Sequence, residues 1–127
     1  MKPIVLLRHA SAGDREDWGG DDESRPLDER GLAQAEELVH ALDRYEIERV
    51  LTSPYVRCVQ SVAPLAQRLG LEIEERAELA EGATREETLA LVDELRGSGA
   101  VLCTHGDVVV ELLGTGLKKG AMAILEP

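Results

Sequence analysis

Short apolar runs that alternate with helical segments constrain the fold of this chain more than any other sequence feature. The runs PIVLL at 3–7 and AVLCT at 100–104 are almost wholly apolar, which is typical of strands buried on both faces of a sheet. A third short strand is expected at 48–53, and a helical pattern follows it. Because such alternation favours parallel strands joined by helices, the sequence predicts an α/β fold. We expect a three-layer α/β/α sandwich with a mostly parallel central sheet and helices on both faces.

The remaining predicted elements carry recognisable start and stop signals. Asp28 is expected to N-cap a helix with the apolar stripe Leu32, Ala35, Val39 and Leu42. The other expected elements are a helix with Ser53 at its N-cap, Pro54 in its first turn and its end at Gly70, an edge strand at 71–75, a helix at 84–97 opened by the capping box Thr84 and Glu87, a helix at 107–114 and a strand at 121–125.

The length of 127 residues fits one domain, and we expect residues 1–127 to form a single domain. Hydrophobic residues make up 43% of the chain and charged residues 31%, which is ordinary for a globular protein with a core. No stretch approaches the roughly 20 apolar residues of a membrane span, and the first residues lack the layout of a signal peptide. These features favour a cytoplasmic protein without a membrane partner.

The formal net charge of the chain is −11. An acidic surface repels phosphate backbones, so the charge argues against general nucleic-acid binding. It also makes any local cluster of arginine and histidine more informative than it would be in a basic protein.

Neither cysteine is expected to carry chemistry. Cys58 and Cys103 lie in apolar surroundings and form no CxxC pair, which argues against a disulfide framework or a zinc site. A cysteine-dependent phosphatase needs an arginine in the loop after the thiol, and the corresponding positions hold Pro64 and Val109. We therefore expect both cysteines to be small core residues.

Cationic side chains follow three of the predicted strands. Arg8 and His9 end the first strand, His105 follows the strand at 100–104, and Arg57 lies one turn into the helix after the second strand. Ligands of open parallel sheets bind beyond the carboxyl ends of the strands. Parallel neighbours would gather two guanidiniums and two imidazoles on one rim beside a helix N-terminus, an arrangement suited to a phosphoryl group.

Each of these residue types has a role in phosphoryl transfer. His9 is the expected nucleophile, because a neutral imidazole can attack phosphorus when a backbone acceptor holds its other nitrogen as N–H. Arg8 and Arg57 would hold the phosphoryl oxygens and stabilise the transition state, and His105 would donate to the same oxygens. Glu81, in the segment ELAEG, is the candidate acid for the leaving group.

Taken singly, each of these residues has a plainer explanation. Arg8 and His9 could be solvated strand ends, His105 a satisfied core histidine, and Glu81 an ordinary solvated carboxylate; their joint placement is what favours a site. A metal site of His9, His105 and Asp107 lacks the usual ligand spacing, so no metal and no cofactor is expected.

The long polar connection after the first strand leaves two alternatives open. Arg25 and Trp18 either line the mouth of the site, or Arg25 pairs with the acidic run at 21–23. Ser11 and Ser53 are expected to cap loops rather than to contact a ligand.

Four motifs, in this order along the chain, resemble the signatures of the histidine phosphatase superfamily, the phosphoglycerate mutase-like or RHG enzymes: LLRHASAG, LTSPYVRCVQSV, LAEG and LCTHGDVV. The resemblance extends from residue 3 to about 125, nearly the whole chain. It implies a phosphohistidine intermediate on His9, a phosphate pocket of Arg8, Arg57 and His105, and an acid at Glu81.

Within that family, the short length and the segments RHASA, RPLDERG and KKGAMAIL are most similar to the SixA-type phosphohistidine phosphatases. They also resemble the phosphatase domains joined to nudix hydrolases in actinobacteria. Ala10 stands where the family usually has glycine, and no long inserted cap like that of the mutases is present. SixA-type members often work without a carboxylate acid. The chain stops at Pro127, early for the family, so we expect its C-terminus to be short.

Together these features predict a metal-independent phosphatase that forms a phosphohistidine on His9. The uncapped pocket favours a phosphohistidine-bearing protein as the substrate, and a small phosphoester or nucleotide is the alternative. A non-catalytic phosphate-binding module that docks phosphorylated partners is the alternative from another class. The sequence leaves the oligomeric state open.

Overall fold

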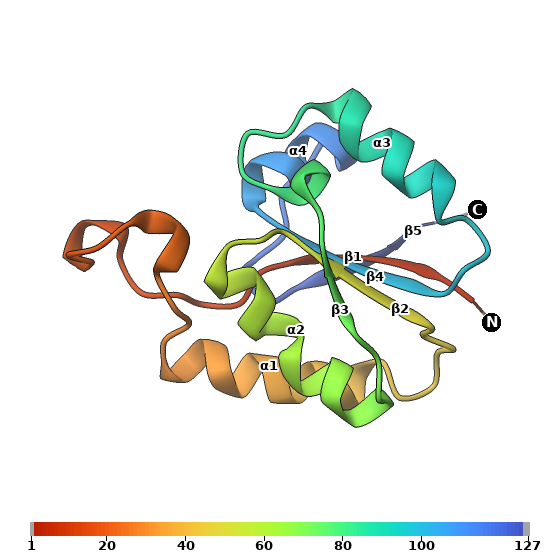
Figure 1. Ribbon diagram of the computed structural model, residues 1–127, viewed down its shortest axis with the longest axis horizontal. Coiled ribbons are helices and arrows are strands. Elements are labelled where there is room, and N and C mark those ends of the chain that lie inside the picture. The colour runs from red at the N-terminus through yellow and green to blue at the C-terminus, as the bar shows by residue number, and fades with distance from the viewer. Residues whose placement is uncertain (1, 126–127) are drawn as a thin grey trace.

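The computed structural model describes residues 2–125, which fold into a five-stranded sheet between two pairs of helices (Figure 1). No helix in this range is long and apolar enough to cross a bilayer. The strands are β1 (Ile4–Arg8), β2 (Arg49–Thr52), β3 (Ile73–Glu75), β4 (Ala100–Thr104) and β5 (Met122–Leu125). The helices are α1 (Glu29–Ala41), α2 (Val56–Leu69), α3 (Arg85–Glu94) and α4 (Gly106–Leu113), with short 3-10 helices η1 (Arg15–Asp17), η2 (Asp22–Ser24) and η3 (Ala77–Leu79).

Strand β4 lies at the centre of the sheet, whose order is β3-β2-β4-β1-β5. It pairs in parallel with β1 on one side and with β2 on the other, and β3 continues the parallel arrangement beyond β2. At the opposite edge β5 runs antiparallel to β1. The prediction of a mostly parallel sheet is confirmed.

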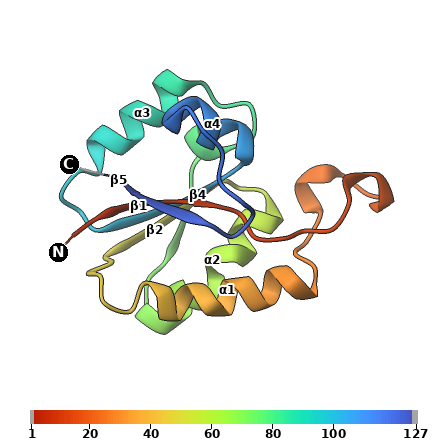
Figure 2. The same cartoon turned by 180° about the vertical axis from the view of Figure 1, so that it is seen from behind.

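Helices α1 and α2 cover one face of the sheet, and α3 and α4 cover the other (Figures 1 and 2). Successive strand residues point to opposite faces, so Val5 and Leu7 pack in the core under α1 and α2. Ile4 and Leu6 pack in the core under α3 and α4. The predicted three-layer α/β/α architecture is therefore confirmed, and because the chain has no phenylalanine, aliphatic side chains dominate both cores.

The start of α2 differs from the sequence prediction. Its N-cap is Tyr55, whose backbone is extended, and the helix begins at Val56 rather than next to Ser53. The hydroxyl of Ser53 contacts the His105 ring and also accepts from the N–H of Tyr55, the residue that precedes the helix.

Two further helix details also differ. Leu32, predicted to face the core, is 51% exposed, because it lies in the first turn of α1, where Gly31 faces the neighbouring backbone. Leu38 is buried on that helix instead. Helix α3 ends at Glu94 rather than at Gly97, and turns complete the connection to β4.

The connection between β1 and α1 projects beyond the carboxyl edge of the sheet and contains η1 and η2 (Figures 1 and 2). Arg25 ties it together: its guanidinium donates to the carbonyl oxygens of Ala12 and Gly13, and it forms an ion pair with Asp22 at 3.2 Å. The loop is thereby held close to the end of β1.

Helix α1 approaches this segment most closely at Gly31. Asp28 caps the helix, with Oδ1 accepting from the Gly31 N–H and Oδ2 accepting from the Ser11 hydroxyl, both at 2.8 Å. A Cβ atom at Gly31 would overlap the carbonyl oxygen of Ser11. The helix therefore fixes the backbone that immediately follows His9.

Gly31→Ala is expected to lower the free energy of unfolding by about 2 kcal/mol, because the added methyl group must displace the Ser11 backbone. Helix propensity alone would act in the opposite direction by about 1 kcal/mol. Equilibrium unfolding in urea measures the change, with Leu32→Ala on the exposed side as the control. A more stable Gly31→Ala protein would contradict the close packing.

Candidate active site

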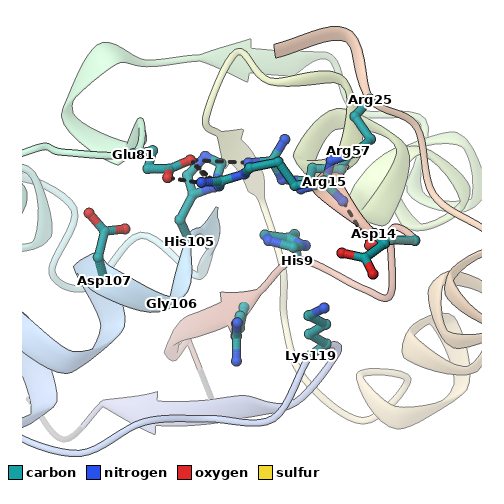
Figure 3. A pocket seen from close by; sticks show the side chains of 12 residues that line it. His9, Asp14, Arg15, Arg25, Arg57, Glu81, His105, Gly106, Asp107 and Lys119 are labelled. Carbon is teal, nitrogen blue, oxygen red and sulfur yellow. Dashed lines mark hydrogen bonds and ion pairs between the residues drawn. The ribbon is translucent and has the colours of Figure 1, made fainter. Parts of the chain in front are cut away.

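A pocket of about 280 Å³ opens at the carboxyl edge of the sheet, beyond the ends of β1, β2 and β4 (Figure 3). Its lining includes all five residues named from the sequence: Arg8, His9, Arg57, Glu81 and His105. The other lining residues are Gly13, Asp14, Arg15, Arg25, Gly106, Asp107 and Lys119. Segments far apart in the sequence thus bring the candidate residues into one cavity.

His9 is held in the form that a nucleophile requires. It is 6% exposed, and its Nδ1 lies 2.8 Å from the carbonyl oxygen of Ala10. A carbonyl only accepts hydrogen bonds, so Nδ1 carries the proton and Nε2 keeps its lone pair. The pKa of His9 is lowered from 6.5 to about 3, chiefly by burial and in smaller part by the nearby His105, Arg57 and Arg8, while the hydrogen bond to Ala10 acts in the opposite direction. The ring is therefore neutral at pH 7.

His105, the N-cap of α4, places its ring centroid 5.4 Å from that of His9. Its Nε2 lies 2.9 Å from the hydroxyl oxygen of Ser53, which accepts from the backbone N–H of Tyr55 at 3.3 Å. The Ser53 hydroxyl can donate to Nε2 while its oxygen accepts from Tyr55, and in that arrangement the ring proton of His105 is on Nδ1. Since Nδ1 is 4.0 Å from Glu81 Oε2, that N–H donor lies on the side of the pocket.

Two guanidiniums present unpaired donors beside these rings. Arg57 is 1% exposed, and Arg8 lies against the start of α4, where a Cβ on Gly106 would come within 3.0 Å of the guanidinium. Within residues 2–125, the Nε of each arginine is buried and has no hydrogen-bond partner. A buried donor without an acceptor costs about 1–3 kcal/mol. Both donors suit a ligand with several charged oxygens, such as a phosphoryl group.

Glu81 reaches the pocket from the loop after η3 and contacts two arginines. Its Oε2 lies 3.1 Å from Nη2 of Arg57, and its Oε1 lies 3.1 Å from Nη2 of Arg15 (Figure 3). Asp22, in the first loop, pairs with the same two arginines at 3.1 and 3.3 Å. Two carboxylates thus balance a guanidinium whose burial would otherwise be strongly unfavourable.

Arg15 was missed by the sequence reasoning, and Asp22 was named only within the acidic run at 21–23, not as a partner of Arg57. Both lie in short 3-10 helices of the β1–α1 connection, where no hydrophobic periodicity marks which charges turn inward. Both alternatives left open for Arg25 are found, since it forms an ion pair with Asp22 and also lines the pocket. Trp18 does not line this pocket.

Ser53 and Cys58 also proved closer to the site than expected. Both cysteines are buried and free, as predicted for core residues. Cys58, however, places its Sγ 3.6 Å from Nε2 of His105, and Ser53 contacts the same nitrogen. Ser11 behaves as predicted, since its hydroxyl donates to Asp28 in the loop.

Among the described residues, no group of three or more His, Cys, Asp or Glu side chains converges in a way that could hold a metal ion. His9 and His105 instead face arginines. What the side chains offer together is the nitrogen lone pair of His9, several N–H donors and the carboxylates of Asp14, Glu81 and Asp107.

The fold and the pocket together define an α/β protein in which a neutral imidazole lies beside two arginines at the carboxyl edge of a mostly parallel sheet. The chain belongs to the histidine phosphatase superfamily (branch 1), whose sequence profile matches residues 4–90. The resemblance inferred from the four motifs is thus confirmed, and members of this superfamily are phosphatases.

The individual proteins that this chain is similar to include two kinds of phosphatase. The 8-oxo-(d)GTP phosphatase of Mycolicibacterium smegmatis is 38% identical over 117 residues, which cover 88% of this chain and 36% of that protein. The chain therefore spans about a third of the length of this relative. The SixA protein of Agrobacterium tumefaciens has a similar structure, with a TM-score of 0.79 and 25% identity over 98% of this chain and 91% of that chain. A protein histidine phosphatase SixA complexed with tungstate shares the fold, with a TM-score of 0.76 and 23% identity over 98% and 94% of the two chains.

The lowered pKa of His9 predicts that the fold is sensitive to acid. The unfolded chain protonates this ring below about pH 6.5, whereas the folded protein does so only near a pKa of about 3. Between these values the unfolded state binds more protons, so stability falls with falling pH, by up to about 1.4 kcal/mol per pH unit from this group.

His9→Gln is expected to remove this contribution, so that wild type loses stability relative to the variant between pH 6.5 and 4. Urea unfolding of both proteins at several pH values measures the difference, and other titrating groups cancel because they are common to both. Parallel pH dependences would contradict the lowered pKa.

Proposed function

We propose that this protein is a metal-independent phosphatase that transfers a phosphoryl group to Nε2 of His9 and then to water. The observation that carries the proposal is the neutral His9 imidazole, protonated on Nδ1, beside two buried arginines with unpaired Nε–H donors. The lone pair of the imidazole can attack phosphorus, and the guanidinium N–H groups can donate to the charged phosphoryl oxygens.

In the first step the lone pair of His9 Nε2 forms a P–N bond while the bond from phosphorus to the leaving group breaks. Arg8, Arg57 and the Nδ1–H of His105 hold the phosphoryl oxygens as their charge redistributes. Loss of one such donor typically lowers a rate by about 100- to 1000-fold. Glu81 passes a proton to the leaving atom.

In the second step a water oxygen forms a bond to phosphorus and the P–N bond to His9 breaks. The proton lost by the water goes to Glu81, and inorganic phosphate leaves. The ion-paired carboxylate seen in the structure is the form that accepts this proton. One acid–base group therefore serves both halves of the reaction.

A protein-borne phosphohistidine is the first candidate substrate. Its imidazole leaves more readily than an alkoxide and needs less help from an acid. The pocket opens at the carboxyl edge of the sheet, and we take a large partner to approach it there. The similarity to SixA supports this class.

A small phosphoester or a nucleotide is the second candidate. The 38% identity to the M. smegmatis 8-oxo-(d)GTP phosphatase supports this class. The matched region is 36% of that protein, so we carry over the substrate class rather than the activity of the whole relative.

His9→Ala is expected to lower the turnover of p-nitrophenyl phosphate by more than about 1000-fold, because the nucleophile is lost. Wild type should trap an acid-labile, base-stable phosphoryl group that the variant lacks, as measured by alkaline quench and mass spectrometry. His40→Ala, at an exposed histidine on α1, is the matched control. A chain that binds phosphate but forms no phosphoenzyme would be a binding module, and the proposal would fail.

Glu81→Gln is expected to slow the hydrolysis of an alkyl phosphate ester by about 100-fold or more, because an alkoxide needs the proton. Formation of the phosphoenzyme from a phosphohistidine peptide should slow much less, whereas the second step, which is common to both substrates, slows equally. Rapid-quench measurement of phosphoenzyme formation from each substrate, with Glu86→Gln at an exposed site of α3 as the control, measures the two effects. Equal losses in the rate of phosphoenzyme formation would show that Glu81 acts otherwise than as a leaving-group acid.

A further inference from the structure

A second pocket, of about 350 Å³, lies next to the catalytic one and is unusually basic. Its lining residues are Ser11, Arg30, Gln34, Lys118 and Lys119, and Lys119 also lines the catalytic pocket. No carboxylate contributes to this lining. We call this second pocket the basic groove.

The three cations of the basic groove are not balanced by the protein. The chain has 25 acidic and 14 basic residues, yet no ion pair within residues 2–125 involves Arg30, Lys118 or Lys119. The charge of Lys119 contributes to the lowered pKa of Asp28. The oxygens of this carboxylate, however, already accept hydrogen bonds from Gly31, Ser11 and Gly13. Like charges held together without a partner repel one another, and an anion between them relieves that repulsion.

The walls of the basic groove are fixed to each other. The Gln34 side chain accepts from the Ser11 N–H at 2.8 Å and donates to the Lys119 carbonyl oxygen at 3.3 Å. It also lies so near Gly120, which has a positive φ of 81°, that a Cβ there would come within 3.0 Å of the Gln34 amide. Helix α1 and the loop before β5 are thus clamped together by one side chain.

The basic groove is also tied to the catalytic segment itself. The Gly120 N–H is shared between the carbonyl oxygens of Arg8 and His9, at 3.1 and 3.0 Å. Figure 3 shows Lys119 in the same cavity as His9 and Arg57. Because the two pockets adjoin, one substrate molecule could place its phosphoryl group at His9 and a second anionic group in the basic groove.

We propose that the basic groove binds a second phosphate of the substrate, so that the substrate is a phosphoanhydride such as a nucleoside di- or triphosphate. This inference rests on the proposed function and favours the second of its two substrate classes. The terminal phosphoryl group lies at His9, Lys119 spans the junction, and Arg30 and Lys118 hold the next phosphate. The bond that breaks is then the P–O bond of the anhydride, and the leaving group is the nucleotide with one phosphate fewer.

The rival occupant is an acidic segment of a phosphohistidine protein. Specific protein interfaces bury about 1,200–2,000 Å², whereas the basic charge here is confined to one concave pocket beside the site. A small polyphosphate concentrates its charge where the three cations are.

The test compares the double variant Arg30→Ala/Lys118→Ala with Arg44→Ala/Arg68→Ala. The second variant removes the same charge at exposed positions outside both pockets. For the first variant, the KM for GTP should rise about tenfold or more relative to that for p-nitrophenyl phosphate, which has one phosphate. The control should keep the wild-type ratio. The effect of Arg30→Ala/Lys118→Ala on the KM for GTP should become smaller as the salt concentration is raised.

Binding without turnover makes the inference independent of catalysis. Inorganic tripolyphosphate is titrated into the His9→Ala protein by calorimetry, with and without Arg30→Ala/Lys118→Ala; about a tenfold weaker Kd in the combined variant is expected. Unchanged binding, or equal losses on GTP and p-nitrophenyl phosphate, would overturn the inference. So would a loss confined to an acidic phosphohistidine peptide. Absence of a phosphoenzyme in wild type, with tripolyphosphate binding intact, would refute the proposed function and leave the basic groove standing.

Discussion

The parallel pairing of β4 with both β1 and β2 is the constraint on which the whole site depends. The chain leaves these neighbouring strands at the same edge, and the hydrogen-bond ladder continues one residue further. The His9 N–H donates to the Thr104 carbonyl and the Ser53 N–H donates to the Cys103 carbonyl, both at 3.0 Å. A slip of one residue in either pairing would turn the side chains to the opposite face. His9, Ser53 and His105 would then no longer converge.

The burial of Arg57 shows how an acidic chain prepares a site for an anion. An isolated buried guanidinium is strongly unfavourable, and here Asp22 and Glu81 offset its charge from two separate loops. An arriving phosphoryl group would compete with these carboxylates for the same guanidinium. Binding is therefore an exchange of anionic partners, while the unpaired Nε–H donors of Arg8 and Arg57 give the phosphoryl group contacts that the carboxylates do not make.

The sequence was sufficient for the fold and for the residues at the strand ends, because both follow from local periodicity and from the shared edge of parallel strands. Arg8, His9 and His105 could be placed on one rim without knowledge of any side-chain contact. Ser53 could not be assigned to the His105 ring, since a serine before proline is equally consistent with a cap. The contact of Asp22 with Arg57 was not predicted for another reason: it depends on how the long β1–α1 connection packs over the sheet edge.

The two histidines have opposite roles because their second hydrogen-bond partners differ in chemistry. The Ala10 carbonyl can only accept, so it takes the ring proton of His9 on Nδ1 and leaves a lone pair facing the pocket. The Ser53 hydroxyl, whose oxygen accepts from a backbone N–H, can also donate its proton to Nε2 of His105, and the ring then presents an N–H to the same pocket. Phosphoryl transfer needs one electron pair for phosphorus and several N–H groups for oxygen. If the two partners were exchanged, the ring at position 9 would offer phosphorus a proton where it needs a lone pair, although every ionisable side chain was still in place.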